Sequence, residues 1–232
     1  MKEIFKNRLT GILIISILIL YAKFLYLDIL TAGNYALSRN LKYASIWLCF
    51  LLAILLWKSS SNKADSLLVC IALTFTLIAD WFLLFTNHHQ LGVFFFCFVQ
   101  LTYLQRFKGK NFKISLYLAS TVFIFIAITT FSFNLYVIST LYAYLIISCS
   151  IATFTTKLPK FNRNLAQIGL ILFILCDIHV ALLNTLPPSH HYYHLTTIAT
   201  WLFYLPSQLI LTLSSYHSNQ MAEVAPERAT PS

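Results

Sequence analysis

Residues 73–85 read LTFTLIADWFLLF, an uninterrupted apolar run that carries a single acid, Asp80. A second run at residues 170–182, LILFILCDIHVAL, carries Asp177 at the same position within its own stretch. A charged carboxylate at the centre of a membrane helix costs about 2.5–3.5 kcal/mol on the insertion scale, whereas each neighbouring Leu, Ile or Phe contributes only about 0.3–0.6 kcal/mol of stabilisation. Both segments can still insert, but acids kept at this cost indicate a use.

The composition predicts the class of protein. The chain has 232 residues, of which 59% are hydrophobic and 10% are charged, whereas a soluble domain is about 25% charged. So few charges cannot cover a soluble surface, so we expect one integral membrane domain over residues 1–215. The cysteines lie in apolar runs, where they act as small hydrophobic side chains and indicate no disulfide framework. They are Cys49, Cys70, Cys97, Cys149 and Cys176.

The apolar runs predict an all-α bundle of eight transmembrane helices, because a spanning helix needs about 20 apolar residues. The expected spans are residues 9–30, 41–57, 66–85, 91–104, 114–130, 135–154, 165–183 and 195–214. The fourth is the shortest. The first lacks a small-residue cleavage site and is too long for a signal peptide, so we expect it to be retained. Residues 216–232 form a polar tail that we expect to be disordered.

The basic residues predict the orientation. With the N-terminus in the cytoplasm, thirteen of the sixteen Lys and Arg residues fall in cytoplasmic segments, and only Arg39 and Lys42 fall in outer loops. The positive-inside rule predicts this bias and places both termini in the cytoplasm. The net charge of +9 therefore follows from the topology. It does not indicate nucleic-acid binding, because the basic residues occur in short clusters between apolar helices rather than on one face.

The same topology places the two acids at equal depth. Spans three and seven both run outward, and each acid lies about 14 residues from the cytoplasmic end of its span. At 1.5 Å per residue this is about 20 Å into a hydrocarbon core of about 30 Å. Aligning Asp80 with Asp177 also matches apolar residues along most of both runs, which suggests a weak internal repeat of two four-helix halves.

Other polar residues have simpler interpretations. Five outer-face histidines lack the helical spacing of zinc ligands, so we expect hydrated loop side chains and no metal. They are His88, His89, His190, His191 and His194. His179 follows Asp177 by two residues and faces another side of the helix, which favours a structural hydrogen bond. Lys23 and Asp28, near the outer end of span one, are expected to reach the interface.

Two carboxyl groups in a low-dielectric cavity can act as an acid and base pair. Burial disfavours ionisation of a carboxyl group, and two neighbouring acids do not both ionise readily. One is then kept protonated and the other ionised, as general acid-base catalysis requires. The competing interpretation is structural: each acid is neutral, or hydrogen-bonded to a neighbouring helix.

The sequence resembles the YhhN, or lysoplasmalogenase, family of eight-span membrane proteins over most of its length. The matching segments are LKYASIWL around Lys42, LIADWFLLF around Asp80, FFFCFVQLTYLQRF around Tyr103, the pair Tyr142 and Tyr144, IGLILFILCDIHVALLN around Asp177, and WLFYLPSQLIL with Tyr204 and Gln208. The chain departs from the family pattern at Ala79, Cys176 and Gln100, where the family usually has Gly, Ser and His.

This resemblance implies hydrolysis of the vinyl ether bond of lysoplasmalogens, which gives a fatty aldehyde and a glycerophospho-ethanolamine or glycerophospho-choline. It implies that Asp80 and Asp177 are catalytic and that no metal or cofactor is needed. An apolar chamber opening sideways to the lipid would accept the alkenyl chain. Lys42 would meet the phosphate as a point charge, and Tyr103, Tyr204 and Gln208 are candidate hydrogen-bonding neighbours.

A second hypothesis comes from another class of protein. In a transporter or a lipid-binding membrane protein, the two acids would form a proton relay or a cation site. Such proteins often contain broken helices at the middle of the membrane. Neither acid has Gly or Pro beside it, but span eight contains Pro206 just before Gln208, where a local opening could form.

Overall fold

The computed structural model describes residues 8–31, 36–109, 135–187 and 189–216, and its described residues form seven α-helices and no strand. The helices are α1 (Arg8–Thr31), α2 (Ala36–Ser59), α3 (Lys63–Phe85), α4 (His89–Lys108), α6 (Leu135–Thr155), α7 (Lys160–Thr185) and α8 (Tyr193–Leu213). All of them except α4 are long and apolar enough to cross a membrane. The chain is therefore an all-α, multi-pass membrane protein.

Each predicted span that falls on described residues coincides with the middle of a helix, and most of these helices extend beyond the predicted ends. The helices extend past the apolar runs into polar residues, so that α2 begins at Ala36 and Lys42 lies in its second turn. The fourth segment forms a 20-residue helix, but it is not apolar enough to be counted as a span. Its polar residues include Gln100 and Arg106, which are buried inside the bundle. The predicted fifth span, the tail after residue 216 and the repeat of two halves are not shown by the described residues.

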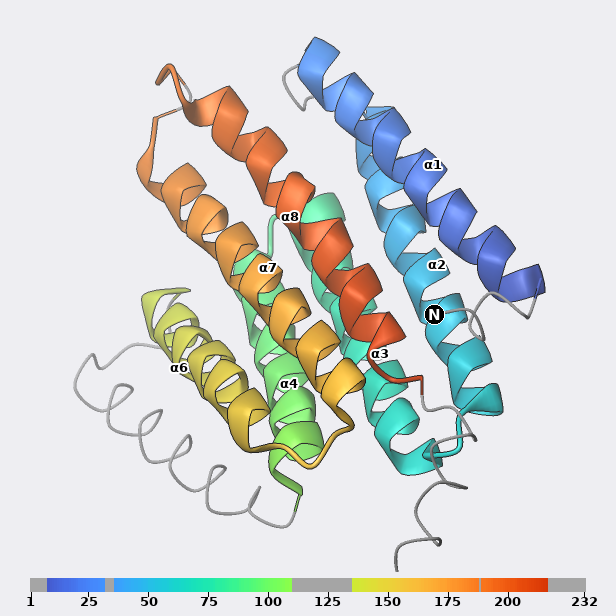
Figure 1. Cartoon of the computed structure of the whole chain (residues 1–232). Helices are drawn as coiled ribbons and strands as arrows, with labels where there is room; N and C mark the ends of the chain where they lie inside the picture. Colours follow the sequence, from blue (N-terminus) through green and yellow to red (C-terminus); the bar gives the residue numbers. More distant parts are fainter. Residues whose placement is uncertain (1–7, 32–35, 110–134, 188, 217–232) are drawn as a thin grey trace, which may run out of the picture.

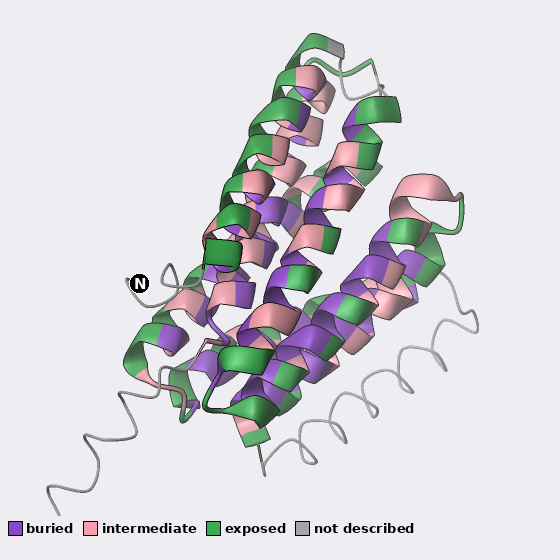
Figure 2. Ribbon diagram, turned by 90° about the vertical axis from the view of Figure 1, so that its right-hand side faces the viewer, coloured by how far each residue is buried: buried purple, intermediate pink, exposed green. Residues whose placement is uncertain are grey.

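The helices form a closed ring around a shared interior. Around the ring, α2 packs against α3, α3 against α4, α4 against α6, α6 against α7, α7 against α8, and α8 against α2 (Figure 1). Helix α1 lies outside the ring, against α2 and α8. Buried residues face the interior and exposed residues face outward (Figure 2). Large apolar side chains such as Ile15, Trp47 and Phe154 are exposed on the outside, as expected for a surface in contact with lipid.

One end of the bundle is held by a buried arginine. Arg106 of α4 forms two hydrogen bonds of 2.8 Å with the Asp65 carboxylate of α3, and it also donates to the side chain and the carbonyl of Ser214 at the end of α8. Asn162 of α7 donates to the same Ser214 carbonyl at 2.8 Å. Charge-assisted bonds of Arg106 thus join α4 to α3 and α8 in an apolar surrounding, where such bonds are strongest, and the neutral bond of Asn162 adds α7.

Helix α8 continues without a break through Pro206. Proline lacks the N–H that would bind the carbonyl four residues earlier, here that of Leu202. The hydroxyl of Tyr21 on α1 donates to this carbonyl at 2.8 Å. A neighbouring helix therefore satisfies the backbone group that proline frees, and the opening suggested by the sequence near Gln208 does not occur.

A close approach of α4 to α3 fixes the surroundings of Asp80. A Cβ atom added at Gly92 would lie 2.6 Å from the Leu83 side chain and 3.1 Å from the Ala79 carbonyl oxygen. Only glycine fits at this contact, which presses the start of α4 against the turn of α3 that carries Asp80.

The orientation in the membrane is a prediction that labelling can test. The five native cysteines are buried, so a cysteine introduced at an exposed position reports on that position alone. In intact cells, a cysteine at Ser189, between α7 and α8, should react with a membrane-impermeant maleimide. A cysteine at Lys58, at the end of α2, should react only after permeabilisation. The reverse pattern would contradict cytoplasmic termini.

Candidate functional site

The carboxyl group of Asp80 lies inside the ring and is bound by a tyrosine from the opposite side. Asp80 is on α3 and is only 3% exposed. The hydroxyl oxygen of Tyr204, on α8, lies 2.9 Å from its Oδ1 and 2.8 Å from its Oδ2. Tyr204 therefore donates a hydrogen bond to the carboxyl group across the interior. This bond gives both polar groups a partner, which lipid chains cannot provide.

The second acid has the same kind of partner. Asp177 is on α7 and is partly buried. The hydroxyl of Tyr142, on α6, donates to its Oδ2 at 2.8 Å. Its Oδ1 has no hydrogen-bond donor among the residues that the structure describes. Each intramembrane carboxyl thus accepts a hydrogen bond from one tyrosine of another helix. Its oxygens can still exchange a proton or form a hydrogen bond with a further group.

Aromatic rings connect the two pairs. The ring of Phe96 on α4 lies 6.3 Å from that of Tyr204 and 6.1 Å from that of Tyr142, measured between centroids. Phe173 on α7 completes the contact, at 5.8 Å from Phe96 and 5.7 Å from Tyr204. The two tyrosine–aspartate pairs are therefore connected through one cluster of aromatic rings, which contains Phe96 and Phe173.

Lys42 forms an ion pair that the sequence analysis did not anticipate. Its Nζ lies 2.8 Å from Oδ2 of Asp28 on α1, and Asp28 is 0% exposed. The interpretation of Asp28 as an interface side chain is therefore wrong, whereas Lys23 on the same helix is exposed. An acid placed near the end of a span can turn inward when a cation of the next helix meets it.

A single ring separates this ion pair from the Asp80 pair. Nζ of Lys42 lies 5.0 Å from the centroid of the Trp201 ring, in the geometry of a cation–π contact. The same ring lies edge-on to Tyr204 with centroids 5.1 Å apart. Lys42, Trp201, Tyr204 and Asp80 therefore form a continuous row of contacts from α2 through α8 to α3.

The other two candidate residues are buried but do not bind a carboxyl in the described structure. Gln208 is one turn after Tyr204, and its Oε1 has no donor among the described residues. Tyr103 stacks on Phe107 at 6.1 Å, and its hydroxyl is likewise unpartnered there. Gln100 lies one turn after Phe96, and its side-chain Nε2 and Oε1 also have no hydrogen-bond partner among the described residues.

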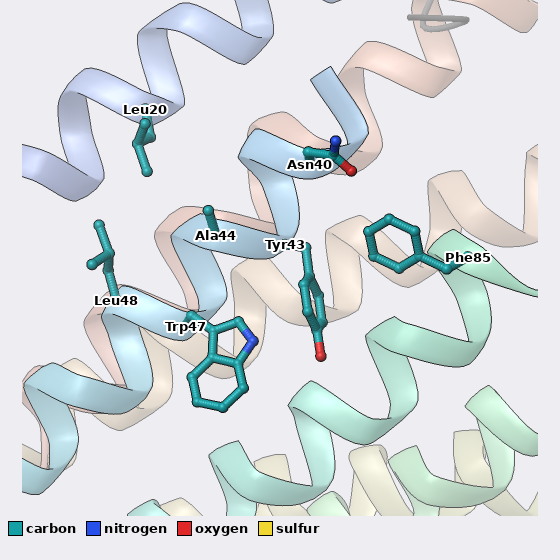
Figure 3. A pocket seen from close by; sticks show the side chains of 7 residues that line it. All are labelled: Leu20, Asn40, Tyr43, Ala44, Trp47, Leu48 and Phe85. Atoms are coloured by element: carbon teal, nitrogen blue, oxygen red, sulfur yellow. The ribbon is translucent and has the colours of Figure 1, made fainter. Parts of the chain in front are cut away.

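A shallow groove is present on the outer face of α2, with a volume of ≈ 450 Å³ (Figure 3). Its lining is apolar and aromatic, and it contains no carboxylate. The lining residues are Leu20, Asn40, Tyr43, Ala44, Trp47, Leu48 and Phe85. The lining side chains come from α1, α2 and α3, and none of them is an acid.

Histidines of the described residues form no hydrogen bond with Asp80 or Asp177. His179 Nδ1 lies 2.7 Å from the carbonyl oxygen of Leu175 in its own helix, which confirms the predicted structural hydrogen bond. Within the described ranges, no group of three or more His, Cys, Asp or Glu side chains is arranged to hold a metal ion.

The fold and this site define a multi-pass membrane protein with two tyrosine-bound acids in its interior. The sequence matches the YhhN family over residues 41–215, and the chain belongs to that family. The matched region contains every predicted site residue and excludes α1. No curated protein and no solved structure matches the chain.

The geometry predicts different stability effects for the buried acids. Asp80→Asn and Asp177→Asn should leave the melting temperature unchanged or raise it, because the amide oxygen still accepts from the tyrosine and no charge is buried. Asp65→Asn should instead lower stability by about 3–5 kcal/mol, because it leaves the Arg106 guanidinium buried without its carboxylate. Thermal unfolding in detergent measures both effects. A large loss in the Asp80 variant would indicate a structural role.

Proposed function

We propose that this protein hydrolyses the vinyl ether bond of lysoplasmalogens, releasing a fatty aldehyde and a glycerophospho-ethanolamine or glycerophospho-choline. The observation that carries the proposal is the pair of intramembrane carboxyls, Asp80 and Asp177, each accepting from a tyrosine around the Phe96 cluster. Membership of the YhhN family supports it.

The chemistry needs only a proton donor, a carboxylate and water. A neutral aspartic acid protonates the vinyl ether carbon that is not bonded to oxygen, and the other carbon becomes an oxocarbenium ion. The second carboxylate stabilises this cation and takes a proton from the attacking water. The hemiacetal that forms then breaks its C–O bond, giving the aldehyde and the glycerol hydroxyl, and the two acids return to their starting protonation states.

The surroundings of the carboxyls suit this reaction. The tyrosine hydroxyls hold each carboxyl in a fixed orientation, which keeps it aligned with the reacting carbon. The rings of Phe96 and Phe173 exclude bulk water and present π faces near a developing cation. Gln208, which lies one turn after Tyr204 on α8, offers a buried amide for the glycerol or for the attacking water.

Transport or simple lipid binding remains the other outcome of the tests. In that alternative the two acids form a proton relay or a cation site, and α8 offers no break beside them because it is continuous through Pro206. Purified protein in liposomes should therefore release aldehyde from a lysoplasmalogen. Uptake or binding without any aldehyde would reject the hydrolase and favour a proton or cation site.

Substitution of the aspartates tests the catalytic pair directly. Asp80→Asn or Asp177→Asn removes a proton donor or a charge at nearly constant volume, so each should lower kcat by at least ~100-fold. Because the two act as a unit, the double variant should be little worse than the worse single variant. The release of aldehyde at saturating lysoplasmalogen measures this. Full activity in either variant would reject the mechanism.

Lys42 is expected to act in binding rather than in chemistry, because its charge lies one ring away from the Asp80 pair. Lys42→Ala should raise KM by about 10-fold or more and leave kcat nearly unchanged. Lys58→Ala, which removes an exposed charge from the other end of α2, is the matched control and should change neither constant. A large fall in kcat for Lys42→Ala would place Lys42 in the chemical step.

A further inference from the structure

Lys42 is already neutralised by the chain itself. Its ammonium group is 2.8 Å from the Asp28 carboxylate, and Lys42 is only 5% exposed. Ser38, two residues into α2, donates its hydroxyl to the other oxygen of Asp28 at 2.5 Å. The rings of Phe24 and Trp201 lie over the ammonium at 5.9 and 5.0 Å. Lys42 is therefore a binding site for an anion, and in this structure the anion is the carboxylate of Asp28.

A buried ammonium in this surrounding requires an anion at all times. Little water reaches Lys42, so the loss of Asp28 without replacement would leave an uncompensated charge. A lysophospholipid phosphate diester carries one negative charge, as a carboxylate does. If the phosphate replaces the Asp28 carboxylate beside Lys42, the net charge around Lys42 does not change. If the phosphate bound while Asp28 stayed in place, one anion would be unpaired.

Asp28 belongs to the helix that can most easily move. Among the residues that the structure describes, helix α1 packs mainly on α2 and α8, and it is the least buried of the six candidate spans. Asp28 lies in its last turn, which ends at Thr31. A small displacement of this turn brings the carboxylate to the interface, where water can solvate it. The family match begins at residue 41, so Lys42 lies inside it and Asp28 outside.

We propose that Asp28 is an exchangeable counterion that holds Lys42 until the phosphate of a lysophospholipid replaces it. The identity of the ligand rests on the proposed function. The ion pair then competes with the ligand and sets its affinity, and the last turn of α1 opens and closes the phosphate site. Lys42 binds the phosphate. Asp28 makes the site specific for ligands that carry an anion, because only an anionic group can replace its carboxylate beside Lys42.

Binding to a catalytically inactive chain tests the exchange. In an Asp80→Asn background, the probes are a radiolabelled lysophosphatidylethanolamine and the monoacylglycerol of the same chain, which lacks the phosphate. Adding Asp28→Asn removes the competitor and should tighten binding of the phospholipid by about 10-fold or more. Affinity for the monoacylglycerol should not change. Adding Lys42→Gln should make the two ligands bind equally well.

Two controls separate exchange from a general effect of losing a buried acid. Asp28→Glu keeps the negative charge and should leave both affinities close to the parent values. Asp65→Asn removes the acid of the other buried ion pair, at the opposite end of the bundle, and should change neither affinity although it destabilises the fold. Phospholipid binding by Asp28→Asn that is unchanged or weaker would overturn the proposal.

A milder variant decides the question if Asp28→Asn does not fold. Ser38→Ala removes one hydrogen bond to Asp28 and leaves the ion pair in place, so Asp28 is released more easily and phospholipid binding should tighten by about twofold or more. An unchanged affinity would reject the exchange. The proposed function is measured separately: wild-type protein that releases no aldehyde but shows this binding pattern would reject the hydrolase and retain the phosphate site.

Discussion

Polar groups inside this bundle must find partners within it, because lipid offers none. Several buried charged groups therefore determine which helices become neighbours. Arg106 binds Asp65 and joins α3, α4 and α8 at one end. Lys42 and Asp28 join α1 to α2 at the other. Between these ends, the Tyr204–Asp80 pair joins α8 to α3 across the interior, and the Tyr142–Asp177 pair joins the neighbouring helices α6 and α7.

The sequence predicted the helices well where the apolar run was long, because length and hydropathy alone decide insertion. It was least accurate for α4, whose buried Gln100 and Arg106 lower its apolar content. Those residues face a protein interior rather than lipid, and composition cannot distinguish the two surroundings. The helix ends were also short, because Lys63 and Lys160 are helical although they are charged.

The candidate acids could be found from the sequence because their cost is local: one carboxylate in one apolar run. Their partners could not. Whether Tyr142 faces Asp177 depends on how α6 packs beside α7, and α6 has almost no apolar periodicity from which to predict that face. Asp28 shows the same limit. Because Asp28 lies near a helix end, the sequence predicted contact with water at the interface. Asp28 is buried instead, paired with Lys42 of the next helix.

The two buried cations differ in what they can offer a substrate. In a lysoplasmalogen, the three carbons of glycerol connect the phosphate to the vinyl ether, so a cation for the phosphate must lie close to the acids. Arg106 does not meet this requirement, because its guanidinium is bound to Asp65 and Ser214 at the end of the bundle. Lys42 does, because only the Trp201 ring separates it from Tyr204 and Asp80. If the proposed function holds, the distribution of charge therefore favours substrate entry from the end of the ring where α1 ends and α2 begins.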